Sequence, residues 1–123
     1  MSGTFFNTSI NEIFIPASIE ELDDMCFNGM NFLKEITISD KNKHFTFLDD
    51  EKRVVVAKSD PYNEDYDVIV YAIRNIRKVV IPSFVRSIRP YAFSDCIKLI
   101  DIGFSEDSQL QSIGSSAFNM ASF

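Results

Sequence analysis

The 123-residue sequence contains no tryptophan, one histidine, two cysteines and only four glycines. The lone His44 and the distant pair Cys26 and Cys96 make no cluster of metal ligands. The scattered glycines form no phosphate-binding loop. Two cysteines make no disulfide framework, and we expect both to be buried thiols that do not pair with each other. These absences predict no metal, no cofactor and no catalytic site, so the chain is not expected to be an enzyme.

Long apolar runs and clustered positive charge are also scarce. The longest apolar run, residues 68–73, is too short to span a bilayer. The first residues show no basic and apolar leader pattern. A net charge of −6 opposes non-specific binding to nucleic acid. We therefore expect no nucleic-acid partner and no membrane insertion by this chain, and an intracellular location if the chain is complete.

What the sequence does contain is internal repetition. Residues 13–22 return as residues 79–88, and the same offset carries Phe27 to Phe93. A second, shorter offset carries Phe93 to Phe118. Self-similarity with a period in the twenties is typical of solenoids, in which each repeat buries its apolar side against its neighbours. Solenoids usually act as extended binding surfaces.

Each repeat has three equivalent apolar positions, and the last two are spaced as in a strand with one buried face. A proline, Pro16 or Pro82, ends two of these strands. A small residue followed by phenylalanine comes later in each repeat, which predicts a stacked aromatic ladder in the core. The apolar sets are Ile10, Ile13 and Ile15; Leu33, Ile36 and Ile38; Ile76, Val79 and Ile81; and Leu99, Ile102 and Phe104. The later pairs are Cys26-Phe27, Ala92-Phe93 and Ala117-Phe118.

The middle of the chain departs from this pattern. Residues 40–75 have no small-residue–phenylalanine pair, but residues 44–48, 53–57 and 67–72 are rich in strand-forming residues. The polar turn 49–52 would join the first two runs as a hairpin. We interpret this segment as one irregular repeat, which either continues the core or offers a partner-binding insertion. Its acidic residues 60–67 lack the EF-hand glycine and terminal glutamate, which favours a solvated loop over a Ca²⁺ site.

The pattern of residues 79–99, Val-Val-Ile-Pro followed by Val85, Ile88, Ala92-Phe93 and Leu99, resembles the BspA-type leucine-rich repeat. The resemblance covers most of the chain in three recognisable copies. It is specific over residues 79–118 and looser over 13–38, where Met30 replaces the cysteine found at Cys96. The resemblance implies a curved leucine-rich-repeat solenoid, mainly β with short turns or helical segments. It also implies partner binding without known catalysis, and for many members a surface-associated role in adhesion.

We therefore expect one solenoid domain over residues 1–123, with regular repeats at about 10–38 and 76–123 and the irregular repeat at about 40–75. The predicted function is a module that binds a protein or a glycan through its strand face or its inserted loop. The alternative is a structural subunit, because the array starts and stops within a repeat and has no polar cap. Its open ends would then be covered by neighbouring chains or lead to self-association.

The candidate binding residues follow from strand alternation, which points them away from the buried positions. Two ladders are expected on one exposed sheet surface. One ladder is Phe14, Thr37, Val80 and Gly103, and the other is Glu12, Glu35, Lys78 and Asp101. The predicted partner-binding set is Glu12, Phe14, Glu35, Thr37, Lys78, Val80 and Asp101.

Overall fold

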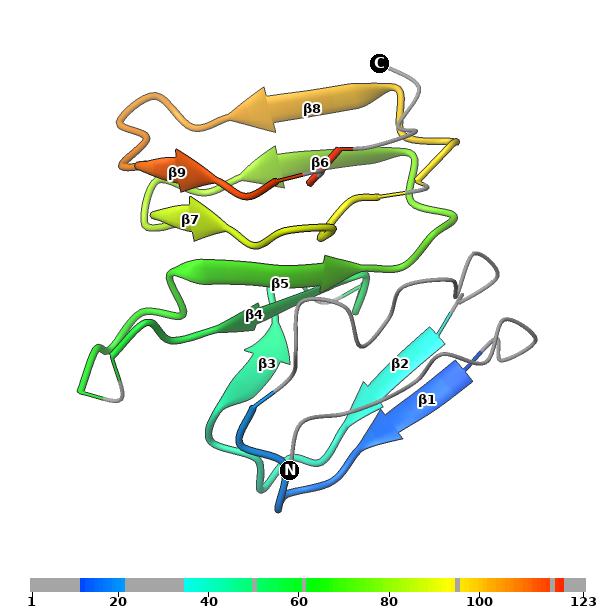
Figure 1. Cartoon of the computed structure of the whole chain (residues 1–123), viewed down its shortest axis with the longest axis vertical. Coiled ribbons are helices and arrows are strands. Elements are labelled where there is room, and N and C mark those ends of the chain that lie inside the picture. The colour runs from blue at the N-terminus through cyan, green and yellow to red at the C-terminus, as the bar shows by residue number, and fades with distance from the viewer. Residues whose placement is uncertain are drawn as a thin grey trace.

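The computed structural model of the chain describes residues 12–21, 35–49, 51–60, 62–94, 96–115 and 117–118. Within these ranges every regular element is a β-strand, and turns rather than helices connect them. The predicted mainly-β solenoid is confirmed, with coils stacked along its long axis (Figure 1). The strands are β1 (Glu12–Ile15), β2 (Glu35–Ile38), β3 (Phe45–Phe47), β4 (Val54–Ala57), β5 (Val68–Ala72), β6 (Lys78–Ile81), β7 (Ser87–Ile88), β8 (Asp101–Phe104) and β9 (Ser112–Ile113).

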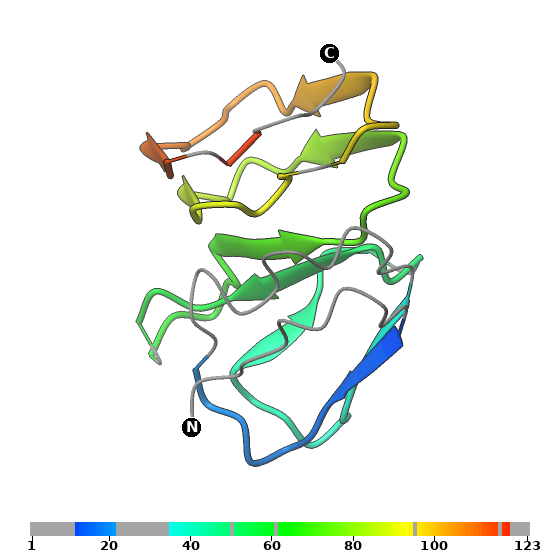
Figure 2. The ribbon, with the colours of Figure 1, turned by 45° about the vertical axis from the view of Figure 1, so that its right-hand side comes forward.

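Regular coils stack through parallel pairs whose register follows the sequence repeat. β1 pairs with β2, β6 pairs with β8, and β7 pairs with β9. In the upper coils, β6 with β8 and β7 with β9 form two opposite walls (Figure 2). Residues that the repeat aligns in sequence are therefore neighbours in space. Examples are Ile13 beside Ile36, Val79 beside Ile102, and Ile88 beside Ile113.

The irregular repeat forms the predicted antiparallel strands and joins them to the solenoid. β3, β4 and β5 are consecutive antiparallel neighbours, and the other edge of β5 pairs in parallel with β7. One five-stranded sheet, ordered β3-β4-β5-β7-β9, therefore runs from the hairpin into the regular coils. β5 is the junction at which antiparallel pairing changes to parallel pairing.

Arg53 fastens the β3–β4 turn to the next regular coil. Its Nη2 lies 2.9 Å from Asp49 Oδ2, and its Nε lies 3.0 Å from Glu51 Oε2. Its Nη1 donates a hydrogen bond to the carbonyl of Lys78, at the start of β6. Lys52 completes the turn with a positive φ of 59°. One guanidinium thus holds the turn closed and anchors it to a neighbouring strand.

The core lies between the two walls and contains the repeated phenylalanine. Phe93 is fully buried, and its ring stacks on Phe118 with centroids 5.1 Å apart and planes 1° from parallel. This contact confirms the predicted ladder for these two members, while Phe27 lies outside the described residues. Burial also fits the predicted inward positions of β1, β2 and β6, where Ile15, Ile36 and Ile81 are at most 2% exposed.

Phe104 departs from the predicted inward set. The alternation pattern expects it to be buried like Ile81, but it is 48% exposed. Its strand β8 is at the edge of its sheet, and so is β9, where Ile113 is 51% exposed. No described strand pairs with the outer edge of β8 or β9 to help cover these side chains. The repeat pattern predicts which way a side chain points from its strand. The side chain is buried only where a neighbouring coil also covers it.

Close backbone contact between coils depends on Gly114. Its amide donates to the carbonyl of Ile88 in the preceding coil at 2.7 Å. A Cβ atom at this position would lie 2.3 Å from the nitrogen of Pro90 and 2.7 Å from the carbonyl carbon of Arg89. No side chain fits into that space without moving backbone. Gly103, by contrast, has room for a Cβ atom, because its nearest neighbour would be Val80 Cγ2 at 3.8 Å.

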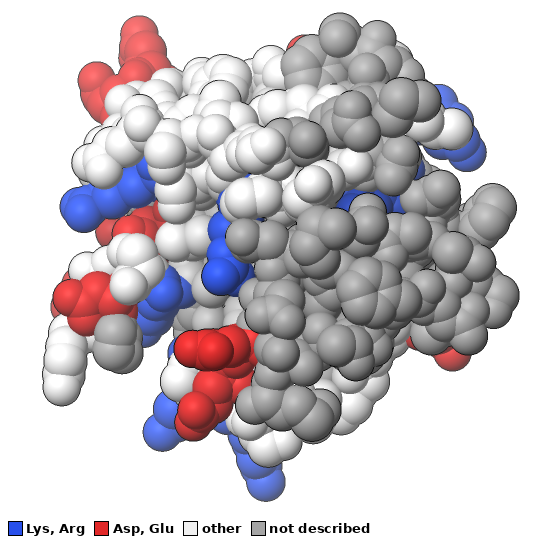
Figure 3. All heavy atoms as spheres, viewed as in Figure 1, with Lys and Arg blue, Asp and Glu red and all other residues white. Residues whose placement is uncertain are grey.

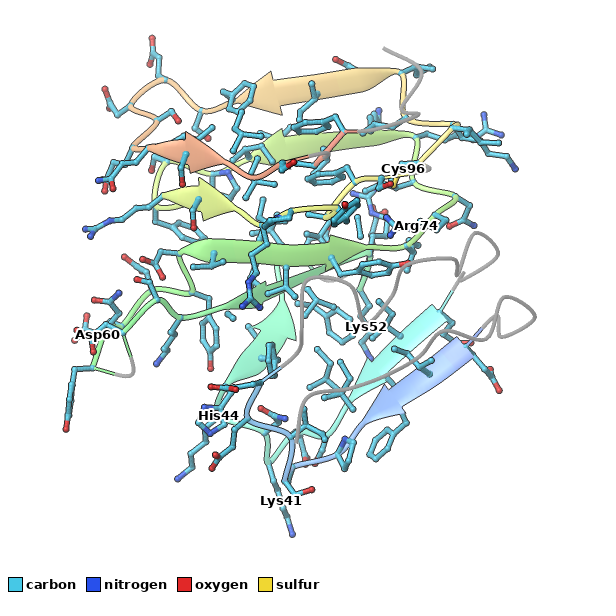
Figure 4. The ribbon with its side chains drawn as sticks, in the orientation of Figure 1. Lys41, His44, Lys52, Asp60, Arg74 and Cys96 are labelled. Atoms are coloured by element: carbon cyan, nitrogen blue, oxygen red, sulfur yellow. The ribbon has the colours of Figure 1, made fainter. Side chains whose placement is uncertain are left out.

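Arg74 is a buried cation that braces the turn beginning at Tyr91. Its guanidinium donates to the carbonyls of Ala92 and Tyr91 and lies over the ring of Tyr71, 3.9 Å from the centroid. Its Nη1 is also 3.7 Å from Sγ of Cys96, and the labelled side chains lie together in Figure 4. Cys96 is a buried thiol, as predicted, and Cys26 lies outside the described residues.

Candidate interaction surface

The outward residues of β1 and β2 form the first part of the candidate surface. Glu12 lies beside Glu35, and Phe14 lies beside Thr37, in the parallel register of the two strands. All four side chains are exposed, and Phe14 keeps 55% of its surface in solvent. Aligned like charges repel each other, so this face favours a partner that brings positive charge. We call these four residues the acidic strand face.

The outward residues of β6 and β8 form a second, chemically different face. Lys78 lies beside Asp101, and Val80 lies beside Gly103. Opposite charges are aligned here, and Val80 is 65% exposed next to a glycine with no side chain. We call these four residues the mixed strand face. One lysine and one aspartate leave it with no excess of one charge.

The expectation of one continuous four-residue ladder is wrong. β1–β2 and β6–β8 are separate two-stranded sheets, with no pairing between β2 and β6. The chain between them passes through β3, β4 and β5, which belong to another sheet (Figure 1). All seven predicted partner-binding residues are exposed, as alternation requires, but they belong to two separate sheets rather than one.

Sequence reasoning missed several exposed apolar residues. Ile100 is 69% exposed and precedes β8, and its amide donates a hydrogen bond to the carbonyl of Arg77. The equivalent positions of the other repeats hold Asn11, Lys34 and Arg77. An isoleucine at a position that is polar in the other copies was the available signal. Phe104 and Ile113 are also exposed in the last coils, and the described surface over β8 and β9 carries charge mainly at its margin (Figure 3).

The inserted loop, residues 59–66, is the other predicted binding element. It projects beyond β4 and β5, with Asp60 marking it in Figure 4. Asp67 fixes its base by accepting hydrogen bonds from the amide and hydroxyl of Ser59 at 2.8 and 2.6 Å. Burial alone would raise the pKa of Asp67, but these bonds and the charge of Arg86 lower that pKa below its ordinary value. The backbone carbonyl of Asp67 also accepts from the amide of Arg86, which joins the loop to the regular coil.

Neither catalytic chemistry nor a metal site emerges from the described side chains. His44 lies 4.0 Å from Glu20 on the surface, with both side chains exposed to solvent. No group of three or more histidine, cysteine, aspartate or glutamate residues converges as metal ligands within the described ranges. Those ranges also include no helix long and apolar enough to cross a membrane. The arrangement offers exposed strand faces and a projecting loop, which are surfaces suited to binding.

Comparison with solved structures identifies bacterial repeat proteins of the same fold. A leucine-rich repeat protein from Eubacterium ventriosum matches 90% of this chain with a TM-score of 0.74 and 22% sequence identity. A leucine rich cell surface protein from Faecalibacterium prausnitzii matches 89% with a TM-score of 0.73 and 25% identity. The chain spans 27% of the length of each of these proteins. No curated protein matches it.

Comparison with protein families gives the same result from sequence. The BspA type leucine rich repeat region matches residues 1–47 and 66–123 in six copies, whereas the sequence pattern indicates three. The unmatched residues 48–65 lie inside the irregular repeat and contain β4 and most of the inserted loop. Most of the sequence therefore carries the family pattern, and the fold agrees with it: the chain belongs to the BspA type leucine rich repeat family.

Proposed function

We propose that this chain is a non-catalytic interaction module that binds a protein partner through its strand faces, in a surface-associated setting, with a glycan as the alternative partner class. Repeat proteins of this kind are generally non-catalytic. The single observation that carries the proposal is the acidic strand face, where Phe14 is 55% exposed on the same side as aligned Glu12 and Glu35. A large exposed ring beside charged groups is typical of a recognition surface.

The test is a matched pair of surface variants assayed for capture of a partner from the native source. Phe14→Ser with Glu35→Lys alters the acidic strand face. Tyr62→Ser with Asp60→Lys makes an aromatic-to-serine change and a charge reversal of the same size on the inserted loop, where Tyr62 is 93% exposed. All four residues are exposed, so both proteins should keep the wild-type melting temperature. We expect only the strand variant to lose partner binding.

The reverse result would move the functional surface to the insertion. If binding survives the strand variant and is abolished by the loop variant, the inserted loop carries recognition. If neither variant changes capture of the partner, the mixed strand face is the remaining candidate surface. It is tested in the same way with Val80→Ser and Lys78→Glu.

A second candidate function is that of a structural subunit within a larger assembly. The observation that favours it is the exposure of Phe104 and Ile113 at 48% and 51%, whereas the equivalent Ile81 and Ile88 are at most 1% exposed. Apolar side chains left uncovered on a stack of coils favour a further layer on that side.

Sedimentation velocity separates the two candidates. An interaction module should remain monomeric as the protein concentration rises. A structural subunit should self-associate, and Phe104→Ser with Ile113→Ser should return it to the monomer. Self-association that persists in this variant would exclude these edge residues as the contact.

A further inference from the structure

A small pocket opens between the irregular repeat and the regular coil that follows it. Its volume is about 170 Å³. Its floor is apolar and is formed by strand and turn residues that are buried or half-buried, while its rim bears two exposed acids. The buried or half-buried apolar residues that form the floor are Phe47, Leu48, Val56 and Phe84, and the exposed acids at the rim are Glu64 and Asp65. Thr46 and Tyr66 complete the lining and add polar groups to it.

The apolar floor is particular to this place in the array. Phe84 occupies a position at which the equivalent residues of other repeats are Ser18 and Gln109, both exposed. Val56 and Glu64 belong to the segment 48–65 that the family pattern does not match. The pocket therefore arises where a distinctive phenylalanine meets an inserted segment, and it is not a feature of every repeat.

The size of the pocket limits what it can hold. An apolar cavity of about 150 Å³ accommodates a group the size of benzene, whereas sites for drug-sized molecules have volumes of about 300–1,000 Å³. A pocket of this volume suits one apolar side chain, such as leucine, methionine or phenylalanine, entering from a partner.

The rim adds a requirement for charge. Glu64 and Asp65 are exposed, and no ion pair to either is found among the described residues. The nearby Lys58 is engaged with the ring of Tyr66, 4.8 Å from its centroid. Negative charge beside an apolar pocket attracts a ligand that places positive charge next to its apolar group.

The geometry points to a docking pocket for one apolar side chain of a partner protein whose adjacent residues in sequence are lysine or arginine. This inference rests on the proposed function, because it specifies one contact by which an interaction module recognises its partner. The apolar side chain supplies the buried contact, and the flanking cations lie against Glu64 and Asp65.

The test is an NMR titration of the ¹⁵N-labelled full chain with a short synthetic peptide in which one leucine lies between two arginines. We expect weak, saturable binding, with chemical-shift changes centred on residues 46–48, 64–66 and 84. Replacing the leucine of the peptide by serine should weaken binding about tenfold or more, since burial of that side chain is lost. Binding should also weaken as salt is added, because the rim charges are exposed.

Matched variants test the two halves of the pocket separately. Glu64→Lys with Asp65→Lys should weaken peptide binding about tenfold and remove its dependence on salt. Glu106→Lys with Asp107→Lys, on an exposed turn after β8, changes the net charge equally and should leave the affinity at the wild-type value. Phe84→Ser places at this position the residue found at the equivalent Ser18, and it should remove the preference for leucine over serine in the peptide.

Four results would overturn the inference. These are no binding at millimolar peptide, equal binding of the leucine and serine peptides, shift changes centred elsewhere on the chain, or concentration-dependent shifts of the pocket residues without peptide. The last result would assign the pocket to a second copy of the chain. The proposed function is tested separately by Phe14→Ser with Glu35→Lys, which should bind the peptide normally. Suppose that Phe14→Ser with Glu35→Lys loses the partner and that the peptide does not bind to the wild-type chain. The proposed interaction module would then stand, and the docking pocket would be rejected.

Discussion

Replacing Phe93 by alanine tests the repeat register at its centre. The ring is fully buried and stacks on Phe118 at 5.1 Å, and the backbone around it is fixed by the hydrogen bond from its amide to the carbonyl of Ala117. Because the coils above and below hold the cavity open, we expect a loss of about 3–5 kcal/mol, the usual range for a buried aromatic ring. For a chain of this size, that corresponds to a melting temperature lower by about 10–20 °C.

The measurement is urea and thermal unfolding followed by far-ultraviolet circular dichroism, since the chain has no tryptophan to report by fluorescence. Phe14→Ala is the matched control, because its 55% exposed ring should cost less than about 1 kcal/mol. Phe118→Ala should fall between the two, as that ring is only partly buried. If Phe93→Ala does not fold, Phe93→Leu gives a smaller and measurable loss. A cost for Phe93→Ala as small as that for Phe14→Ala would refute the register.

Three further predictions use other parts of the fold. Gly114→Ala should lower the melting temperature strongly, because its Cβ would lie 2.3 Å from the nitrogen of Pro90, whereas Gly103→Ala should be nearly neutral. Comparable losses in these two variants would show that the coils do not approach as described. Asp67→Asn should be less stable than wild type at neutral pH, since the lowered pKa of Asp67 means that its ionised form is stabilised by folding. The difference in the free energy of unfolding between the two proteins, measured with urea, should be constant above about pH 5. It should shrink as the pH falls below about 4, because Asp67 becomes protonated first in the unfolded state and then in the folded state. A difference that grows in acid would contradict this prediction. Cys96 should react with a thiol reagent only after unfolding, and a reducing agent should leave the melting temperature unchanged; rapid labelling of the native protein would contradict its burial.

The sequence was sufficient to predict the register of the described parallel strand pairs β1–β2 and β6–β8. Aligning the repeats places Ile13 with Ile36 and Val79 with Ile102, and these residues are the partners across the parallel strands. The success has a simple physical basis. A solenoid stacks equivalent positions, so self-alignment and strand register are the same information.

The parts that could not be predicted depend on contacts between unlike segments. The pairing of β5 with β7 is made by backbone groups, which leave no mark in the pattern of side chains. For the same reason, the sequence did not reveal that the strand faces lie on two sheets. The pocket beside Phe84 could not be predicted either. Its lining combines a residue of the regular repeat with the loop around Glu64, and the repeat pattern does not determine where that loop lies.

The junction at β5 also implies an order of folding. The nearest paired residues are 8 apart in β3–β4 (Phe47 and Val55) and 11 apart in β4–β5 (Ala57 and Val68). Partners are 19 residues apart in β5–β7 and 25 apart in β7–β9, so closing those coils costs more chain entropy. We expect the hairpin strands to form first, on the microsecond scale of local β structure. The free edge of β5 then offers a template on which β7 and afterwards β9 can add. The irregular repeat would thus act as the nucleus from which the regular coils on its C-terminal side grow in one direction.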